Sequence, residues 1–303
     1  MPYVVTQSCC SDASCVYACP VNCIHPTPDE PDFATAEMLY VDPAACVDCG
    51  ACATACPVDA ITSTKKLTAR EQPFIEINAD FYRFERPRPL LARPVPVAEV
   101  HAGCGPLRVA IVGSGPSAMY AADELLTQPE ISVTVFDRLP VPYGLARHGV
   151  APDHTRTRQV SRLFDVISAQ PRFGSYLNLT VGEDISHTEL LNHFDAVIYA
   201  VGASTDRKPG LPGAGLPGSV SATEFVAWYN GHPDYADRDV DLSHRRAVIV
   251  GNGNVALDVA RILTMDPELL ADTEISPPAL EALRRSRIEE VMIVARRGPA
   301  ESA

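Results

Sequence analysis

Four cysteines near the start of the chain limit its possible folds more than any other feature. They lie in the stretch CVDCGACATACP, from Cys46 to Pro57, and are separated by two, two and three residues. This spacing, with proline after the last cysteine, is typical of thiolates that bind an iron-sulfur cluster. The stretch therefore predicts an electron-transfer protein.

An earlier cysteine run, CCSDASCVYACP, differs from this pattern at one position. It has Asp12 midway between Cys9 and Cys15, where a repeat of the pattern would have cysteine. The last cysteine of each run precedes a proline. Together the runs supply eight candidate metal ligands: Cys9, Asp12, Cys15, Cys19, Cys46, Cys49, Cys52 and Cys56. The alternative is a zinc ribbon, in which two C-x-x-C knuckles form one tetrahedral site, but eight positions with two following prolines fit two clusters better.

The position of the cysteines and the net charge exclude some classes of protein. Nine of the ten cysteines precede residue 57, in a chain of 303 residues that is long enough for two or three domains. The net charge of -13 argues against nucleic-acid binding, which needs clustered Lys and Arg. The chain begins without a signal-peptide pattern, and no apolar segment approaches the roughly 20 residues of a membrane span. We therefore expect a cytoplasmic protein without membrane insertion, in which clustered thiols are metal ligands rather than disulfides.

We expect a multi-domain chain with four segments. Residues 1–78 form a cysteine-rich domain, and residues 79–106, with five prolines and four arginines, form an extended linker. Residues 107–203 and 204–303 each contain a buried strand, a glycine turn, a helix and a further strand, which indicates two α/β dinucleotide-binding folds. Two such folds predict two nucleotide ligands.

The first glycine turn lies in LRVAIVGSGPSAMYAADELL. Gly113 allows the tight turn, Gly115 lets the backbone approach a pyrophosphate, and Ala118 allows close packing of helix on strand. The helix N-terminus then faces the phosphates. Asp137 ends the next strand, where an acid should accept hydrogen bonds from a ribose hydroxyl.

The second glycine turn, in RRAVIVGNGNVALDVARIL, has Gly251, Gly253 and Ala256 at the same positions but lacks the acid after its next strand. Arg296 and Arg297 follow that strand instead. Paired guanidiniums suit the 2′-phosphate of NADP, so the second turn favours NADP over NAD. The alternative is that both arginines are solvated surface charges.

Longer motifs connect these features with one group of flavoenzymes. VPYGLARHGVAPDH, IYAVGA, WYNGHPDY and GNGNVALDVARIL resemble the adrenodoxin-reductase-like ferredoxin-NADP reductases. Residues 1–78 resemble a bacterial two-cluster ferredoxin with a βαββαβ fold, and the combination is similar to the ferredoxin-fused reductases of actinobacteria. The resemblance covers nearly the whole chain. It implies FAD on the first turn, NADP(H) on the second, and electron transfer from NADPH through FAD to the clusters and on to a ferredoxin- or cytochrome-type acceptor.

The resemblance to ferredoxins implies that the last cysteine of each run binds the other cluster. One 4Fe-4S cluster would then be bound by Cys46, Cys49, Cys52 and Cys19, and a second cluster by Cys9, Cys15 and Cys56. Asp12 would be a fourth, labile ligand of that second cluster if it is 4Fe-4S, or a neighbour of it if it is 3Fe-4S. Cys23 matches a free cysteine beside the clusters, and Cys10 is a spare thiol.

The resemblance to the reductases implies three sets of residues. Flavin-contact positions match Ser117, Asp137, Leu145 and Val181. NADP-contact positions match Arg207, Asn252, Gly253, Asn254, Val255, Arg296 and Arg297. His154, in the A-P-D-H motif, matches a histidine beside flavin and nicotinamide, although a purely structural histidine is an equal alternative.

The family pattern continues beyond the residues of this chain. A glutamate expected after the RRGP turn, the remaining strands of the NADP-binding domain and a returning FAD-binding segment have no counterpart. We therefore expect the chain to be a fragment of a longer protein. Two other interpretations remain: an iron-sulfur electron carrier with an inactive, truncated reductase part, and a flavoprotein similar to a glutamate-synthase small subunit. The latter lacks the A-P-D-H and W-Y-N-G motifs in this form.

Overall fold

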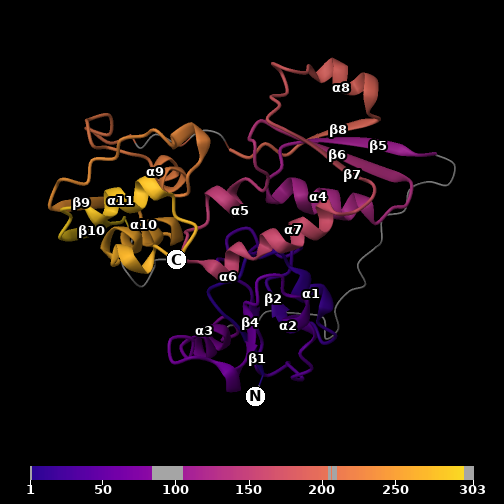
Figure 1. Cartoon of the computed structure of the whole chain (residues 1–303). Helices are drawn as coiled ribbons and strands as arrows, with labels where there is room; N and C mark the ends of the chain where they lie inside the picture. The colour runs from indigo at the N-terminus through magenta and orange to yellow at the C-terminus, as the bar shows by residue number, and fades with distance from the viewer. Residues whose placement is uncertain (1, 84–104, 204–205, 207–209, 297–303) are drawn as a thin grey trace. The chain divides into compact units, whose positions relative to one another are not determined.

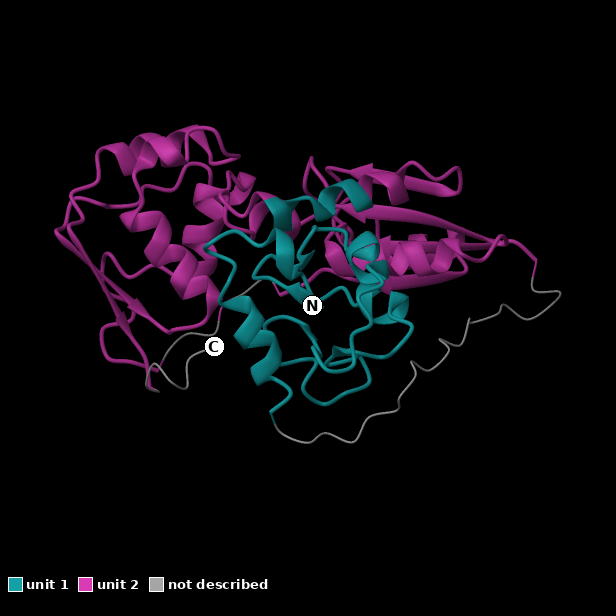
Figure 2. Ribbon diagram, turned by 90° about the horizontal axis from the view of Figure 1, so that it is seen from below, with its two compact units in different colours: residues 1–99, 156–163 teal, residues 100–155, 164–303 magenta. Residues whose placement is uncertain are grey.

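The structure is a computed structural model that describes most of the chain: residues 2–83, 105–203, 206 and 210–296. The chain divides into two compact units, coloured separately in Figure 2: unit 1 has residues 1–99 and 156–163, and unit 2 has residues 100–155 and 164–303. Most of the expected linker, residues 84–104, lies outside the described residues. Each unit is described by itself below.

Unit 1 has the element order predicted for a two-cluster ferredoxin, βαββαβ. The six elements are β1 (Tyr3–Val5), α1 (Ser14–Ala18), β2 (Ile24–His25), β3 (Tyr40–Val41), α2 (Ala51–Ala55) and β4 (Ile61–Ser63). Strands β1 and β4 pair antiparallel, as do β2 and β3. Because these elements are short, the cysteine side chains form much of the core in place of a large apolar layer.

A buried asparagine joins the two strand pairs of unit 1. The turn η1 (Thr64–Lys66) and the helix α3 (Phe74–Asp80) follow β4. Asn78 on α3 is 1% exposed, and its Oδ1 accepts hydrogen bonds from the backbone N–H groups of Val5, at 3.1 Å, and Val41, at 2.9 Å. Its Nδ2 donates to Val5 O at 2.8 Å. The amide thus satisfies backbone groups of β1 and β3 that would otherwise be buried without partners.

The ordered part of unit 1 continues past the expected boundary at residue 78. Helix α3 includes the next two residues, and the Phe81 ring stacks on Tyr40 with centroids 4.4 Å apart. The Tyr82 hydroxyl donates to Tyr40 O at 2.5 Å. These aromatic side chains therefore pack on β3 beyond residue 78 and before the proline-rich stretch begins.

The first nucleotide fold in unit 2 has a four-stranded parallel sheet. Its strands are β5 (Leu107–Val112), β6 (Ile131–Asp137), β7 (Phe173–Leu177) and β8 (Ala196–Tyr199), in the order β7-β6-β5-β8. In chain order this is 3-2-1-4, the arrangement of dinucleotide-binding folds. Helices α4 (Pro116–Leu126) and α8 (His187–His193) lie on opposite sides of the sheet (Figure 1). Helix α5 (Leu145–His148) also belongs to this unit. Nearly all of α6 (Thr155–Arg158) lies in the segment 156–163 that belongs to unit 1, and α7 (Val160–Ser168) begins in that segment and continues in unit 2.

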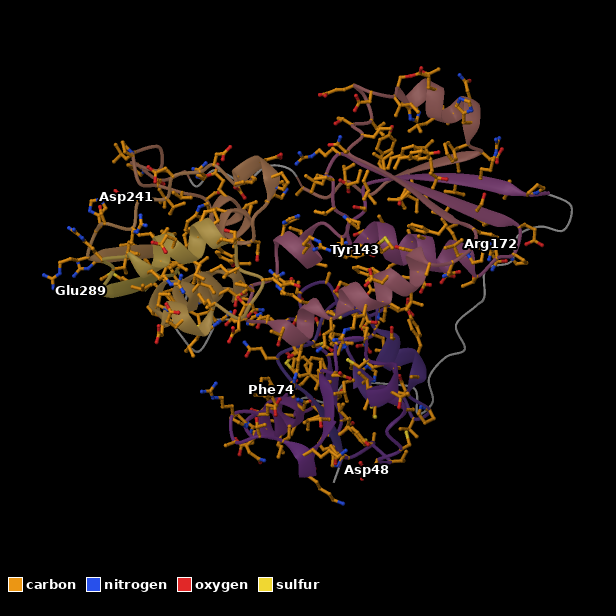
Figure 3. The ribbon with its side chains drawn as sticks, viewed as in Figure 1. Asp48, Phe74, Tyr143, Arg172, Asp241 and Glu289 are labelled. Carbon is orange, nitrogen blue, oxygen red and sulfur yellow. The ribbon has the colours of Figure 1, made fainter. Side chains whose placement is uncertain are left out.

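Strand β5 is buried on both faces, which explains its continuous apolar sequence. Ala110 and Val112 pack with Leu190 of α8, while Ile111 points to the other face and is fully buried. At the far end of the sheet, the Arg172 guanidinium (labelled in Figure 3) donates to Gln128 O at 2.5 Å and to Leu126 O at 2.6 Å. It thereby satisfies carbonyl groups at the C-terminal end of α4.

The second nucleotide fold has its own core. Its elements are α9 (Ala222–Tyr229), η2 (Pro233–Tyr235), β9 (Arg246–Val250), α10 (Asn254–Thr264), η3 (Pro267–Leu269), α11 (Pro277–Arg284) and β10 (Glu290–Val294). The core lies among α9, α10 and α11 and includes Tyr229, Ile262 and Leu283. None of the helices among the described residues is long and apolar enough to cross a membrane.

The sheet of the second fold is poorly covered. Strands β9 and β10 pair in parallel, but Val248, Val250 and Val294 are 56%, 67% and 45% exposed. Parallel strands are normally buried on both faces. Within the described residues, this sheet therefore exposes side chains that its fold class normally covers.

Candidate nucleotide and cluster sites

The first glycine turn has the backbone that a phosphate site requires. Gly113 has φ +104°, and a Cβ there would lie 2.4 Å from Ala200 O, so only glycine fits. Beside Gly115, by contrast, no atom of the described residues outside the adjoining backbone lies within 4 Å of where a Cβ would be. Gly115 is the extended N-cap of α4, and no side chain caps this helix. Its first N–H groups are therefore available to an anion in the open space.

Asp137 is held beside this turn by its neighbours. Its Oδ2 accepts from Ser114 N at 2.7 Å and Ser114 Oγ at 2.6 Å, and its Oδ1 accepts from Leu139 N at 2.8 Å. Ser114 is 1% exposed. The predicted ribose-binding acid is thus oriented by a serine that the sequence analysis missed, although it lies between the two glycines.

The Y-G-L-A-R motif packs directly on the first turn. Tyr143 has φ +86°, rare for a residue with a side chain, and its backbone N–H donates to Ser114 O at 3.0 Å. Its hydroxyl donates to Asp165 Oδ1 at 2.6 Å, and burial together with this bond raises the pKa of Tyr143 (Figure 3). A Cβ on Gly144 would lie 3.0 Å from Gly115 Cα. This close approach starts α5 beside the turn and leaves Leu145 68% exposed there.

The other predicted flavin contacts lie around the same end of the sheet. Leu179 N donates to Asp137 O at 3.0 Å, which brings the segment containing Val181 to the end of β6. On α4, Ala118 is fully buried against the sheet, as the packing role predicts, and Ser117 is exposed in the first turn of the helix.

The second glycine turn repeats the backbone of the first. Gly251 has φ +127°, and its N–H donates to Val294 O at 2.9 Å. Gly253 is the extended N-cap of α10, without a side-chain cap and with no atom within 4 Å of a Cβ. Of the predicted NADP contacts, Asn252 is half-buried, while Asn254 and Val255 are exposed. The turn can present backbone N–H groups to a phosphate.

Arg296 is the one predicted 2′-phosphate ligand that the structure describes. It is exposed and follows β10 by two residues, at the same end of the sheet as Gly251. Arg207 and Arg297 lie outside the described residues.

His154 belongs to a cluster of charged side chains. Its Nε2 lies 3.5 Å from Asp258 Oδ1. Arg261 donates to both oxygens of Asp153, at 2.7 and 3.0 Å, and to Asp258 Oδ1 at 2.7 Å. Burial acts to raise the pKa of Asp153, but the Arg261 guanidinium outweighs it and holds the pKa below its ordinary value. The sequence analysis missed Asp153, Asp258 and Arg261, although all three lie in motifs that it quoted.

The two halves of unit 1 present their cysteines in the same way. Helix α1 begins after Ala13, with φ 65°, and ends at Cys19, while α2 begins after Gly50, with φ 78°, and ends at Cys56. In both halves the last cysteine of the run is the extended C-cap. The hydroxyl of Ser14 donates to the Asp12 carboxylate.

The electrostatic surroundings of two buried thiols indicate which other cysteines lie near them. Burial raises the pKa of Cys15, and the nearby Cys9, Asp12 and Cys56 raise it further. Burial, with Cys46, Cys19 and Cys49 nearby, raises the pKa of Cys52 to about 12. Cys56 and Cys52 thus both lie near Cys15, and Cys19 lies near Cys52. The assignment of cysteines to two clusters stays a prediction. Among the described residues, no three His, Cys, Asp or Glu side chains converge on a position for a single metal ion.

Cys23 and Cys10 lie next to these groups. The Sγ atoms of Cys23 and Cys19 are 3.4 Å apart, and a hydrogen bond from Cys23 lowers the pKa of Cys19. Burial raises the pKa of Cys10 to about 12, so this thiol is a poor nucleophile.

A ferredoxin-type unit followed by two glycine-turn nucleotide folds defines a multi-domain redox protein. A family model described as "4Fe-4S binding domain" matches residues 39–62, and one described as "Pyridine nucleotide-disulphide oxidoreductase" matches residues 107–297. Because the second match covers more than half of the sequence, the chain belongs to the pyridine nucleotide-disulphide oxidoreductase family.

Named relatives show more specifically which proteins the chain is similar to. The "Probable ferredoxin/ferredoxin--NADP reductase" of Mycobacterium leprae is 60% identical over 100% of this chain and 56% of that protein. The "NADPH-ferredoxin reductase FprA" of the same organism is 50% identical over 64% of this chain and 44% of that protein. The solved structure of Mycobacterium tuberculosis FprA in complex with NADPH is 50% identical, with a TM-score of 0.63 over 65% of this chain and 45% of that one. These findings confirm the predicted resemblance, and the chain spans about half the length of the curated relatives it matches.

Proposed function

We propose that this chain transfers electrons between NADPH and ferredoxin-type iron-sulfur clusters through FAD, as part of a ferredoxin-NADP reductase joined to its own ferredoxin. The observation that carries the proposal is the difference in charge beside two similar glycine turns, an aspartate at the first and an arginine at the second. Both turns are in a chain that also has a ferredoxin-type unit. The names of the relatives support the same function.

The first turn is the proposed FAD site. When bound, FAD accepts a hydride from NADPH and delivers electrons singly to iron-sulfur clusters. Gly113 and Gly115 would shape the backbone around the pyrophosphate, and Asp137 would accept hydrogen bonds from the ribose. Ser117, Ala118, Leu145 and Val181 complete the proposed set. The open space beside Gly115, together with the uncapped N-terminus of α4, supports this fit.

The second turn is the proposed NADP site. Asn252, Gly253, Asn254 and Val255 would contact the pyrophosphate side, and Arg296 with Arg297 would recognise the 2′-phosphate. Arg207 is a further proposed NADP contact. The open space beside Gly253 and the uncapped N-terminus of α10 support this assignment. His154 would lie beside flavin and nicotinamide, with Asp258 facing its Nε2.

The thiol groups of unit 1 are the proposed cluster sites. Cys19, Cys46, Cys49 and Cys52 would bind one 4Fe-4S cluster, and Cys9, Cys15 and Cys56 would bind the other, with Asp12 as the fourth ligand of a 4Fe-4S cluster or beside a 3Fe-4S cluster. Electron paramagnetic resonance of the oxidised protein distinguishes the two, because only a three-iron cluster is paramagnetic in that state. The nearness of Cys56 to Cys15 and of Cys19 to Cys52 supports the exchange of the last cysteines between the two sets.

We propose further that the second fold is completed by additional protein. Four exposed apolar residues on one face of the β9–β10 pair, Val248, Val250, Met292 and Val294, support this view. In this proposal, residues 107–203 contribute to the FAD-binding domain and residues 204–303 to an NADP-binding domain. The proposed acceptor is a ferredoxin- or cytochrome-type protein, and the proposed location is the cytoplasm.

The test is anaerobic purification followed by analysis of iron, sulfide, zinc and flavin. Iron and sulfide with bound FAD are expected, whereas zinc without sulfide would overturn the proposal. Cys19→Ser should lose about one cluster's iron, since it removes a proposed ligand. Cys23→Ser is the matched control, because Cys23 is equally buried beside Cys19 but is not a proposed ligand, and it should keep both clusters.

A further inference from the structure

One loop of the first nucleotide fold is held by side chains from the second. The loop, residues 148–154, begins at the end of α5 and finishes at His154. It receives hydrogen bonds from Asn230, at the end of α9, and from Arg261, on α10. These partners are between 80 and 108 residues away along the chain. The contacts therefore connect parts of unit 2 that have separate hydrophobic cores.

Asn230 holds the beginning of the loop. It is 8% exposed, and its Nδ2 donates to His148 O and to Val150 O, both at 3.1 Å. The His148 ring also packs against His232, with centroids 4.9 Å apart. The Asn230 amide thus satisfies two carbonyl groups that are two residues apart in the loop. Two contacts from one side chain fix the path of the loop backbone more strictly than one contact would.

Arg261 holds the end of the loop. Its Nε and Nη2 donate to the two oxygens of Asp153, and its Nη1 donates to Asp258 one turn earlier on α10. Two parallel charge-assisted bonds fix orientation more strictly than a single bond does. The side chains of Arg261 and Asp153 are 30% and 18% exposed, so solvent screens this pair only in part.

We propose that Arg261 and Asn230 are positioning residues, which fix His154 and its loop relative to the helix that follows the second glycine turn. The inference rests on the proposed function, in which flavin and nicotinamide meet beside this loop. Asp258 provides the link, because it pairs with Arg261 and also faces His154 Nε2. Neither positioning residue belongs to the proposed NADP-contact set, so both would act through the loop.

The test compares the variants Arg261→Met and Arg284→Met, each made in the native protein. Arg284 is a matched control, because it makes a similar bidentate pair with Glu268, at 2.8 and 2.9 Å, inside the second fold. Arg261→Met should slow flavin reduction at saturating NADPH by about 10- to 100-fold. The dissociation constant for NADPH should change little, since the loss is not one of uniform binding. Arg284→Met should match the wild type in both measurements.

Hydrogen-deuterium exchange gives a second readout that does not depend on activity. The peptide of residues 148–154 should exchange faster in Arg261→Met than in Arg284→Met, with FAD content unchanged.

The effects of Asp153→Asn and Arg261→Met on the rate should also be non-additive when the two substitutions are combined, because each breaks the same pair. Arg261→Lys keeps the charge but not the bidentate geometry, so its rate of flavin reduction should lie between those of the wild type and Arg261→Met. It replaces Arg261→Met in both measurements if that variant does not fold.

The outcomes separate this inference from the proposed function. If the wild type shows no flavin reduction by NADPH, the proposed function fails, whatever the variants do. If the wild type is active but the Arg261 variants match Arg284→Met in rate and in exchange, the positioning role is overturned. A change in NADPH affinity alone, with an unchanged rate at saturation, would overturn it as well.

Discussion

The two glycine turns have nearly the same backbone but very different surroundings. Each has a left-handed first glycine, an extended second glycine as N-cap and an uncapped helix of 11 residues. Around the first turn, Ala200 O closes on Gly113, Asp137 holds Ser114, and Gly144 packs on Gly115. Around Gly251, the nearest atom to an added Cβ is the Ala256 Cβ at 4.0 Å.

This difference shows that the glycine pattern sets the local turn, whereas the packing around it sets how firmly the turn is held. At least three neighbouring residues fix the conformation of the first turn, as a site for a permanently bound cofactor requires. Within the described residues, the second turn is held by its glycines and by one hydrogen bond to Val294 O. The sheet of β9 and β10 has no described strand in the place that β8 occupies beside the first turn. The predictions below test whether the two turns really differ in this way.

The largest expected effect comes from adding a methyl group to each turn. Gly113→Ala meets both a left-handed backbone and the Ala200 carbonyl 2.4 Å away, so we expect a loss of about 3 kcal/mol or more in stability. The variant should also be purified without FAD. Gly251→Ala meets only the backbone penalty, about 1–2 kcal/mol, and should keep FAD. Flavin content and thermal melting measure both effects, and equal losses from the two variants would remove the contrast.

A smaller effect is expected from removing the acid of the first turn. Asp137→Ala deletes the acceptor of the Ser114 and Leu139 N–H groups as well as the proposed ribose ligand. Since hydrogen bonds to a charged group contribute roughly 1.5–3 kcal/mol each, FAD should bind about 10- to 100-fold more weakly. Fluorescence titration of the flavin-free protein measures this. Asp137→Glu, which keeps the carboxylate, should lose less; equal losses would point to a steric role instead.

The smallest effect is expected at the open second turn. Arg296→Ala should raise the KM for NADPH about 10-fold, because it removes one charge-assisted contact to the 2′-phosphate, and should leave the KM for NADH nearly unchanged. Arg245→Ala is the control, since this exposed arginine pairs with Glu289 (labelled in Figure 3) at the opposite end of the same sheet. If both cofactors are affected alike, Arg296 does not read the phosphate.

Much of the fold could be predicted from local patterns. The resemblance to two-cluster ferredoxins, which depends on the cysteine spacing, implied the βαββαβ order of unit 1. The glycine pattern predicted the strand, turn and helix of each nucleotide fold. These features depend on residues close together in sequence, or on repeats. The extension of unit 1 through Tyr82 was not predicted, because it depends on aromatic contacts with a strand about 40 residues earlier.

The candidate site was predictable only in part for the same reason. Asp137 was identified from its distance along the chain, but the serine that orients it was not. Asp153, Asp258 and Arg261 have no spacing that indicates an ion pair, since the fold joins positions 108 residues apart. Packing decides which charged residues meet, and no local pattern encodes it.

The central claim is that electrons pass from NADPH through FAD to the clusters. The most direct test is to add NADPH anaerobically to the purified native protein and follow the visible flavin band together with the electron paramagnetic resonance of the clusters. We expect loss of the flavin band, followed by the signal of a reduced cluster, with NADPH acting at much lower concentration than NADH. Clusters that are reduced only by a chemical reductant, with a flavin band that NADPH leaves unchanged, would contradict it.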